Sequence, residues 1–161
     1  MTEGKVLVYY GTGRGKSSAA LGLAIRTAEK NETVGIIQFL KIQENQDFLS
    51  RLEPEIKIFR FERSATPFEE MSDEDKQEEK KNIENAVNYA RKALSTEEFD
   101  LLILDEVFGI LEEGMVDIST ILELIEARPL FTTLVLTGRN LPAEIRKKAD
   151  EVVCLTEEKE E

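Results

Sequence analysis

The sequence predicts a three-layer α/β fold, in which a mostly parallel sheet lies between two layers of helices. Short runs rich in apolar and β-branched residues alternate with longer polar stretches of helical composition. Such alternation produces parallel sheets with helices on both faces. Several of the runs are also continuously apolar, which is typical of strands that are covered on both faces.

Six strands and four helices are expected along the chain. The strands are Lys5–Tyr10, Thr33–Leu40, Ile56–Phe61, Leu101–Asp105, Thr132–Thr137 and Glu151–Leu155. The helices lie at about residues 15–30, 73–94, 117–126 and 142–149. Ser72 precedes three acidic residues and is expected to cap the second helix. Pro142 is expected in the first turn of the last helix.

The length of 161 residues is enough for one domain with a substantial core. We expect residues 1–161 to form that domain, with a polar loop at about 62–72 and a frayed acidic tail at about 157–161. No apolar run approaches the roughly 18–20 residues that cross a bilayer. The first ten residues lack the pattern of a secretory signal. We therefore expect a cytoplasmic protein.

The charge balance limits the partners. The chain has 33 acidic and 21 basic residues and a net charge of −12. The electrostatic field of this negative charge repels nucleic acids and anionic membranes, so neither is an expected partner. A small polyphosphate remains possible, because a local group of backbone N–H donors can hold it against the overall field.

Two scarce residue types exclude several chemistries. The chain has no histidine, which excludes Ser-His-Asp triads, histidine acid–base catalysis and histidine metal ligation. Cys154 is the single cysteine, which excludes an internal disulfide and a cysteine-based zinc site. Because Cys154 lies in an apolar run, we expect it to be a small buried core residue.

A glycine-rich segment follows the first predicted strand and leads into the first predicted helix. Its residues are Gly11, Thr12, Gly13, Arg14, Gly15, Lys16, Ser17 and Ser18. Glycines let the backbone approach phosphate oxygens closely, and the following helix N-terminus attracts negative charge. Lys16 would add a mobile positive charge, and the Ser17 hydroxyl is placed to ligate Mg²⁺. The segment therefore predicts a phosphate-binding loop.

The loop departs from the usual G-x-x-x-x-G-K-[ST] pattern, because Tyr10 stands where the first glycine is expected. The structural alternative is a glycine-rich turn that enters a packed helix and leaves Lys16 exposed. The order of strand, glycines, Gly15-Lys16-Ser17 and helix favours the phosphate loop.

A second acidic motif fits beside this loop. The predicted strand Leu101–Asp105 ends in Asp105-Glu106, and ligands of parallel sheets bind at the carboxyl ends of the strands. We expect Asp105 or Glu106 to hold Mg²⁺ directly or through water. The alternative is a buried strand followed by an incidental helix-capping acid.

Four segments in the same order resemble the ATP:corrinoid adenosyltransferases of the CobA/BtuR type. They are GTGRGKSSAALGLAIR (11–26), VGIIQFLK (34–41), FDLLILDEV (99–107) and, after Arg128-Pro129, LVLTGRNLPAEIRKKAD (134–150). That family also lacks the first glycine of the usual loop. The TGR-x-x-P segment is the most discriminating, since general ATPases do not carry it.

The resemblance implies a RecA-like P-loop fold and transfer of the 5′-deoxyadenosyl group of ATP to the cobalt of a reduced corrinoid, with release of triphosphate. It implies Mg²⁺ or Mn²⁺, a homodimer, and a flavoprotein reductase as a possible partner. The lack of histidine is consistent with this reaction, because Co(I) is itself the nucleophile and needs no base.

The same resemblance assigns roles to individual residues. It implies that residues 11–18 hold the triphosphate, that Lys16 and Glu106 are the catalytic candidates, and that Ser17, Asp105 and Glu106 lie near the metal. Further candidates are Gln38, Lys41 and Arg139 for the nucleotide, Glu44 as a nearby acid, and Phe61 and Phe68 for the corrinoid. For Arg139, a surface arginine that closes a turn is an equal alternative. Phe61 alternates with Phe59 in a predicted strand, so the alternative for Phe61 is a core position.

Two other functions remain open at this stage. In a RecA-like ATPase or small kinase, Glu106 would orient a water and the products would be ADP and phosphate. A non-catalytic, nucleotide-gated corrinoid carrier would bind both ligands without forming a cobalt–carbon bond.

Overall fold

The computed structural model describes residues 2–42, 47–63 and 66–159, without the side chains of residues 40–42, 47–49 and 62–63. The strands are β1 (Val6–Tyr10), β2 (Val34–Ile42), β3 (Ile56–Arg63), β4 (Leu101–Asp105), β5 (Thr133–Gly138) and β6 (Glu151–Cys154). The α-helices are α1 (Lys16–Glu29), α2 (Asp73–Ser95), α3 (Val107–Glu112), α4 (Ile118–Glu126) and α5 (Ala143–Arg146). Short 3-10 helices cover η1 (Asp47–Leu52) and η2 (Phe68–Glu70).

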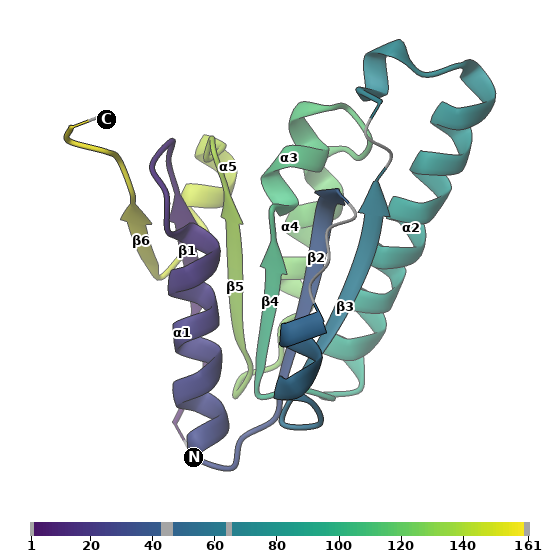
Figure 1. The fold of residues 1–161 in the computed structure, drawn as a ribbon. Helices are drawn as coiled ribbons and strands as arrows, with labels where there is room; N and C mark the ends of the chain where they lie inside the picture. Colours follow the sequence, from purple (N-terminus) through teal and green to yellow (C-terminus); the bar gives the residue numbers. More distant parts are fainter. Residues whose placement is uncertain (1, 43–46, 64–65, 160–161) are drawn as a thin grey trace.

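The strands form one sheet in the order β3-β2-β4-β5-β1-β6, and every neighbouring pair is parallel. All carboxyl ends therefore point to one edge of the sheet, which is the upper edge in Figure 1. The segments that follow β1 and β4 both leave the sheet at this edge, although β5 lies between these two strands. The expected α/β architecture with a parallel sheet is confirmed.

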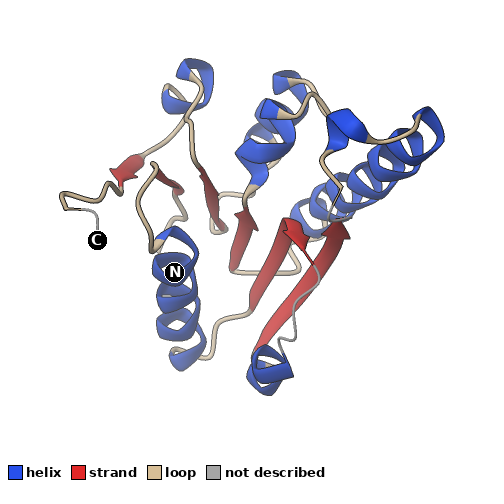
Figure 2. Cartoon of the chain, turned by 45° about the horizontal axis from the view of Figure 1, so that its top comes forward, coloured by secondary structure: helices blue, strands red, loops and turns tan. Residues whose placement is uncertain are grey.

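Helices cover both faces of the sheet (Figures 1 and 2). Leu7 of β1 packs in a core with Ala20 and Ala24 of α1, and Leu52 of η1 adds to this side. Val8, the next residue of β1, faces a larger core that includes residues of α2, α3, α4 and α5. Because both faces are buried, the central strands tolerate continuous apolar runs, which is the pattern that predicted them.

All six predicted strands and all four predicted helices are present, with ends that differ by a few residues. The short helix α3 was not predicted. It has six residues and starts directly after the Asp105-Glu106 pair, with no side-chain cap at its start. A helix of this length carries too little periodicity to be recognised from sequence.

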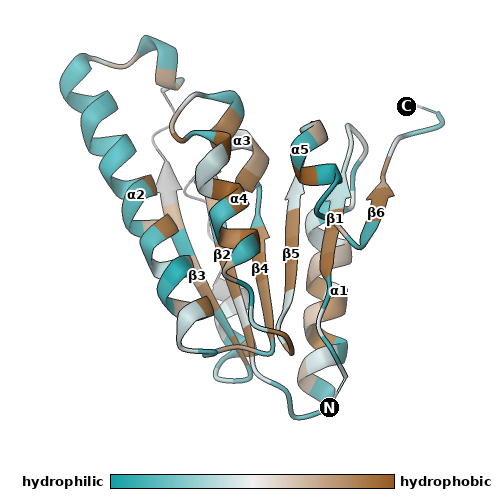
Figure 3. Cartoon of the chain, turned by 180° about the vertical axis from the view of Figure 1, so that it is seen from behind, coloured by the Kyte–Doolittle hydropathy of each residue, from teal (hydrophilic) through white to brown (hydrophobic). Residues whose placement is uncertain are grey.

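The second helix begins as expected. The Ser72 hydroxyl accepts a hydrogen bond from the Asp75 backbone N–H at 3.2 Å, and the acidic residues occupy the first turn of α2. The exposed side of α2 is largely hydrophilic, whereas the central strands are hydrophobic (Figure 3). Within the three described ranges, no helix combines the length and apolar character needed to span a bilayer.

The expectation that Cys154 is a buried core residue is wrong. Cys154 is exposed, and so is its neighbour Val153. The reason is topological, because β6 is the last strand of the sheet and pairs only with β1. The apolar run therefore identified the strand correctly, but it did not show that this strand is the outermost one of the sheet.

Candidate active site

The phosphate loop joins β1 to α1 at the carboxyl edge of the sheet. Gly15 is the residue before α1 and has φ of 104°, a conformation that disfavours side chains. The first turn of α1, which holds Lys16, Ser17 and Ser18, directs its unpaired backbone N–H groups towards the loop. The order of strand, glycine loop and helix thus places a helix N-terminus where the sequence predicts phosphate binding.

Gly11 and Gly13 allow the backbone of the segment after β6 to approach the loop closely. A Cβ on Gly11, which has φ of 123°, would lie 2.2 Å from the Leu155 carbonyl oxygen. A Cβ on Gly13 would lie 2.8 Å from the same atom. The segment after β6 therefore accounts for these two glycines, which the sequence alone attributed to phosphate.

Asp105 at the end of β4 is hydrogen-bonded to Ser17 in the first turn of α1. The Ser17 hydroxyl donates to the two Asp105 carboxylate oxygens, at 2.9 and 3.1 Å. Thr137 is the second-last residue of β5, which lies between β4 and β1, and it donates its hydroxyl to Asp105 at 2.8 Å. Asp105 is only 3% exposed, so a buried carboxylate lies directly beside the first turn of α1.

Glu106 has a constrained backbone. Its φ of 61° is left-handed, and its backbone N–H donates to the Thr137 hydroxyl at 2.9 Å. One threonine hydroxyl thereby connects Asp105 to Glu106. Non-glycine residues in this conformation cluster at functional sites, because the surrounding structure must hold them there.

Thr137 belongs to the candidate site, and the sequence analysis missed it. Its side chain is completely buried and touches the acid pair from the neighbouring strand. The available signal was a hydroxyl residue at the carboxyl end of an apolar strand, directly before Gly138. A Cβ on Gly138 would lie 2.4 Å from Phe108, so this glycine allows α3 to approach β5.

Lys16 lies over the loop that precedes it. Its Nζ donates to the Gly13 carbonyl oxygen at 3.0 Å, and the side chain is half-buried. The Lys16 ammonium and the Ser17 hydroxyl therefore belong to the same short turn. Thr12, Arg14 and Ser18, the remaining predicted residues of the loop, are exposed.

The other predicted nucleotide residues belong to β2 or follow β5. Arg139 is exposed directly after β5, and its carbonyl oxygen accepts the Gly11 backbone N–H at 3.1 Å. Gln38 is buried, pairs in register with Asp105 and accepts a hydrogen bond from Arg60 Nε at 3.2 Å. Lys41 belongs to β2, but its side chain is outside the described part, as is the whole of Glu44.

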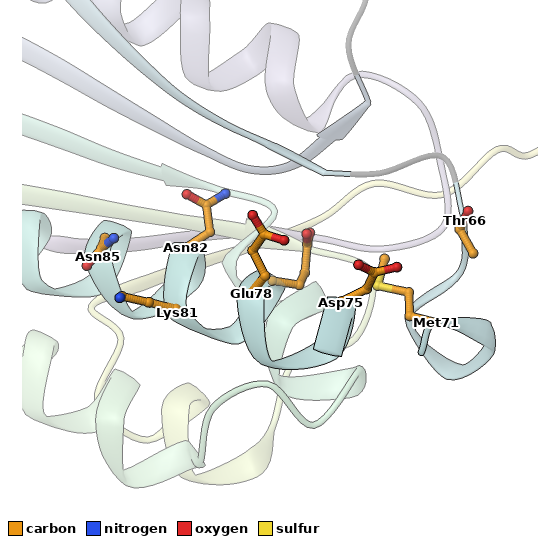
Figure 4. Close-up of a pocket in the computed structure, with 8 residues that line it drawn as sticks. Thr66, Met71, Asp75, Glu78, Lys81, Asn82 and Asn85 are labelled. Atoms are coloured by element: carbon orange, nitrogen blue, oxygen red, sulfur yellow. The ribbon is translucent and has the colours of Figure 1, made fainter. Parts of the chain in front are cut away.

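A cavity of about 560 Å³ follows the first half of α2 (Figure 4). Thr66 and Met71 line one end of it, and carboxylate, amide and lysine side chains of α2 line the rest. Phe68, a predicted corrinoid residue, is buried three residues before Met71, with the Lys76 ammonium 5.7 Å from its ring centre. Phe61 is half-buried and packs against the same core.

The donor set fits Mg²⁺. Among the described residues no cluster of three or more histidine, cysteine, aspartate or glutamate side chains could hold a metal alone. Mg²⁺ needs no such cluster, because it keeps several waters and takes one or two carboxylates plus phosphate oxygens. The Ser17 hydroxyl beside the buried Asp105 carboxylate supplies hard oxygen ligands of this kind.

Tyr9 lies on β1 just before the loop. Burial, and to a smaller extent the charge of Glu151, raise the pKa of the Tyr9 phenol above its ordinary value. Tyr9 therefore stays neutral at the phosphate end of β1 across the physiological range.

A family model described as ATP:corrinoid adenosyltransferase BtuR/CobO/CobP matches residues 2–161. The chain belongs to this family. It is 30% identical to the corrinoid adenosyltransferase of Pseudomonas aeruginosa over 153 residues, which cover 93% of this chain and 73% of that protein. It is 26% identical to the Escherichia coli K12 corrinoid adenosyltransferase over 150 residues, covering 93% and 75% of the two chains.

Solved structures similar to this adenosyltransferase-family chain support the fold. A KaiC-like protein from Pyrococcus horikoshii superposes with a TM-score of 0.62 at 20% identity, covering 99% of this chain and 76% of that one. The flagellar accessory protein FlaH of Methanocaldococcus jannaschii has a TM-score of 0.61 at 14% identity, with 96% and 72% covered. The predicted RecA-like P-loop fold and the predicted family are both confirmed.

Proposed function

We propose that this chain transfers the 5′-deoxyadenosyl group of ATP to the Co(I) centre of a reduced corrinoid, such as cob(I)yrinic acid a,c-diamide or cob(I)alamin. Cobalt attacks the ribose C5′ and a Co–C bond forms as the C5′–O bond breaks. The electron pair of the broken bond leaves with triphosphate, and cobalt is formally oxidised to Co(III). No protein base is required, which agrees with the absence of histidine from the chain.

The observation that carries the proposal is the contact between Ser17 and Asp105 at the start of α1, within a chain that belongs to the adenosyltransferase family. In this proposal residues 11–18 bind the triphosphate, and Lys16 neutralises the charge that develops on it. Ser17 and Asp105 hold Mg²⁺ or Mn²⁺, and Glu106 is the second acid at this position. The metal, when bound, withdraws charge from the leaving phosphate oxygens.

We assign the predicted outer residues to the nucleotide as well. Arg139 orders the loop through its carbonyl bond to Gly11 and presents its guanidinium to a phosphate. Gln38 lies on β2 level with Asp105 and is supported by Arg60, and Lys41 follows it along the same strand. These residues keep ATP aligned for attack at C5′, which is a positioning role.

The direct test is an anaerobic incubation with MgATP and chemically reduced cob(I)alamin. A light-sensitive adenosylated corrin spectrum together with intact triphosphate is the expected result. ADP and phosphate as products would instead identify an ATPase or kinase. Binding of both ligands with neither product would identify a nucleotide-gated corrinoid carrier.

The cavity along α2 is our candidate for the corrinoid region. Met71 lines it, and the Met71 backbone N–H is bonded to the carbonyl oxygen of the buried Phe68. The polar side chains of the lining offer both donors and acceptors to the amide groups of a corrinoid periphery. Phe61 packs in the core next to this region. In this proposal the Phe68 ring shapes the corrinoid surface that the reduction step needs.

Phe68→Ala is expected to impair the reduction-linked step more than ATP binding. Because the ring is buried, unfolding free energy is also expected to fall by about 3 kcal/mol. Turnover is therefore compared below the melting temperature, with pre-reduced and with enzymatically reduced corrinoid. Phe131→Ala, at an exposed phenylalanine, is the control. Equal activity of Phe68→Ala with the two corrinoid preparations would contradict the role.

The family likeness supports a dimer and a reductase partner, and the sequence supports a single domain and a cytoplasmic location. We infer a homodimer of single domains that span residues 1–161. A flavoprotein reductase is the inferred electron donor, and the cytoplasm is the inferred location. Sedimentation of the purified chain tests the dimer directly.

A further inference from the structure

The residues that follow β6 pack on the phosphate loop, and we call Leu155, Thr156 and Glu157 the strap. The Leu155 backbone N–H donates to the Tyr10 carbonyl oxygen at 2.7 Å, and its own carbonyl oxygen accepts the Gly13 N–H at 2.8 Å. Glu157 adds an ion pair with Arg14 at 3.4 Å. The strap therefore occupies the loop from its beginning to the residue before Gly15.

The strap contacts use groups that a triphosphate needs. A backbone N–H has one hydrogen, so the Gly13 N–H cannot serve the Leu155 carbonyl and a phosphate oxygen with full strength at the same time. The other side of Gly13 is also occupied, because its carbonyl oxygen accepts Lys16 Nζ at 3.0 Å. The Arg14 guanidinium is directed to Glu157. Two loop donors and the loop lysine are thus all bound to the protein itself.

We propose that the strap is an intrachain competitor of the triphosphate. Its Leu155 carbonyl holds the Gly13 N–H, and its Glu157 carboxylate holds Arg14, until a bound triphosphate displaces both. This inference rests on the proposed function, which puts the triphosphate on residues 11–18. The Leu155 carbonyl lies so close to the loop that a Cβ on Gly11 or Gly13 would collide with it.

The competition has a consequence for turnover. Two ligands of one site weaken each other reciprocally, so triphosphate loosens the strap by the same factor as the strap loosens triphosphate. Triphosphate is the product that keeps its full charge on the loop after adenosyl transfer. Return of the strap to Gly13 and Arg14 would therefore favour product release.

Hydrogen exchange of the unaltered protein tests the displacement, with magnesium tripolyphosphate as the probe. We expect the Leu155 amide, which is bonded to Tyr10, to exchange several-fold faster when tripolyphosphate is saturating, while amides of β1 stay protected. Unchanged or slower exchange with tripolyphosphate bound would overturn the competition and leave the phosphate site intact. Failure of tripolyphosphate to bind at all would overturn the proposed function and the competition together.

Two variants weaken the strap at different contacts. Leu155→Pro removes the N–H that bonds to Tyr10, and Glu157→Gln removes the charge that faces Arg14. Tripolyphosphate binding is expected to tighten about tenfold for Leu155→Pro and about threefold for Glu157→Gln, the sizes of one hydrogen bond and one exposed ion pair.

Glu158→Gln is the matched control, because it changes the same charge one residue further along the chain. It should change binding less than Glu157→Gln does. Weaker binding by both strap variants, with circular dichroism unchanged, would mean that the strap shapes the loop for phosphate, and this would overturn the proposal.

Discussion

Replacing Lys16 with alanine is expected to lower kcat/KM for MgATP by about 100- to 1,000-fold. The reaction concentrates negative charge on the departing triphosphate, and Lys16 lies on the turn that would hold it, with Nζ 3.0 Å from the Gly13 carbonyl oxygen. The free energy of unfolding should change by less than about 1 kcal/mol, because the side chain is half-buried and its bond is within its own loop.

Steady-state kinetics with pre-reduced corrinoid measures the loss of activity. Lys92→Ala is the control, since it removes the same charge from an exposed position in the last turn of α2. Lys16→Arg separates charge from shape, because arginine keeps the charge on a wider, planar group. If Lys16→Ala and Lys92→Ala were equally active, Lys16 would have no role in triphosphate binding.

The strands were predictable because each one is a short run of apolar residues that can be recognised within its own segment. Ile103 and Leu104 of β4 are both buried, one on each face of the sheet, so an uninterrupted apolar run was the correct signal. An apolar run gave the wrong burial for Cys154, because Cys154 lies in the outermost strand. The order of the strands depends on which segments pair, and no single segment shows it. The helix α3 was missed because it has only six residues, and because the residue before it, Glu106, has a left-handed backbone that the sequence does not show.

In the candidate site, too, some contacts could be predicted from the sequence and others depend on the order of the strands. The sequence predicted that Asp105 would lie beside the loop that contains Ser17, because Asp105 ends one parallel strand and the loop follows another. The hydrogen bond between Ser17 and Asp105 agrees with this prediction. Thr137 was missed, because only the insertion of β5 between β4 and β1 brings its hydroxyl to the acids. The close approach of the Leu155 carbonyl to Gly11 and Gly13 could not be predicted either, since Leu155 lies more than 140 residues away along the chain.

Asp105→Asn is expected to lower kcat/KM by about 100-fold and to raise the Mg²⁺ concentration needed for half-maximal activity. The substitution keeps the shape of the side chain but removes the buried charge beside Ser17. The Ser17 and Thr137 hydroxyls both donate and accept, so they still satisfy a neutral amide. The fold is therefore expected to persist while metal and triphosphate binding weaken.

Asp100→Asn provides the matched control at the opposite end of β4. Asp100 precedes the strand and accepts hydrogen bonds from the Thr33 backbone N–H at 2.8 Å and the Thr33 hydroxyl at 3.1 Å. Its replacement should lower the free energy of unfolding by about 1 kcal/mol and leave kcat/KM and the Mg²⁺ requirement unchanged. Magnesium titrations and thermal unfolding of the two variants make the comparison. An Asp105→Asn enzyme with the parent Mg²⁺ dependence would remove Asp105 from the metal site, whatever its activity.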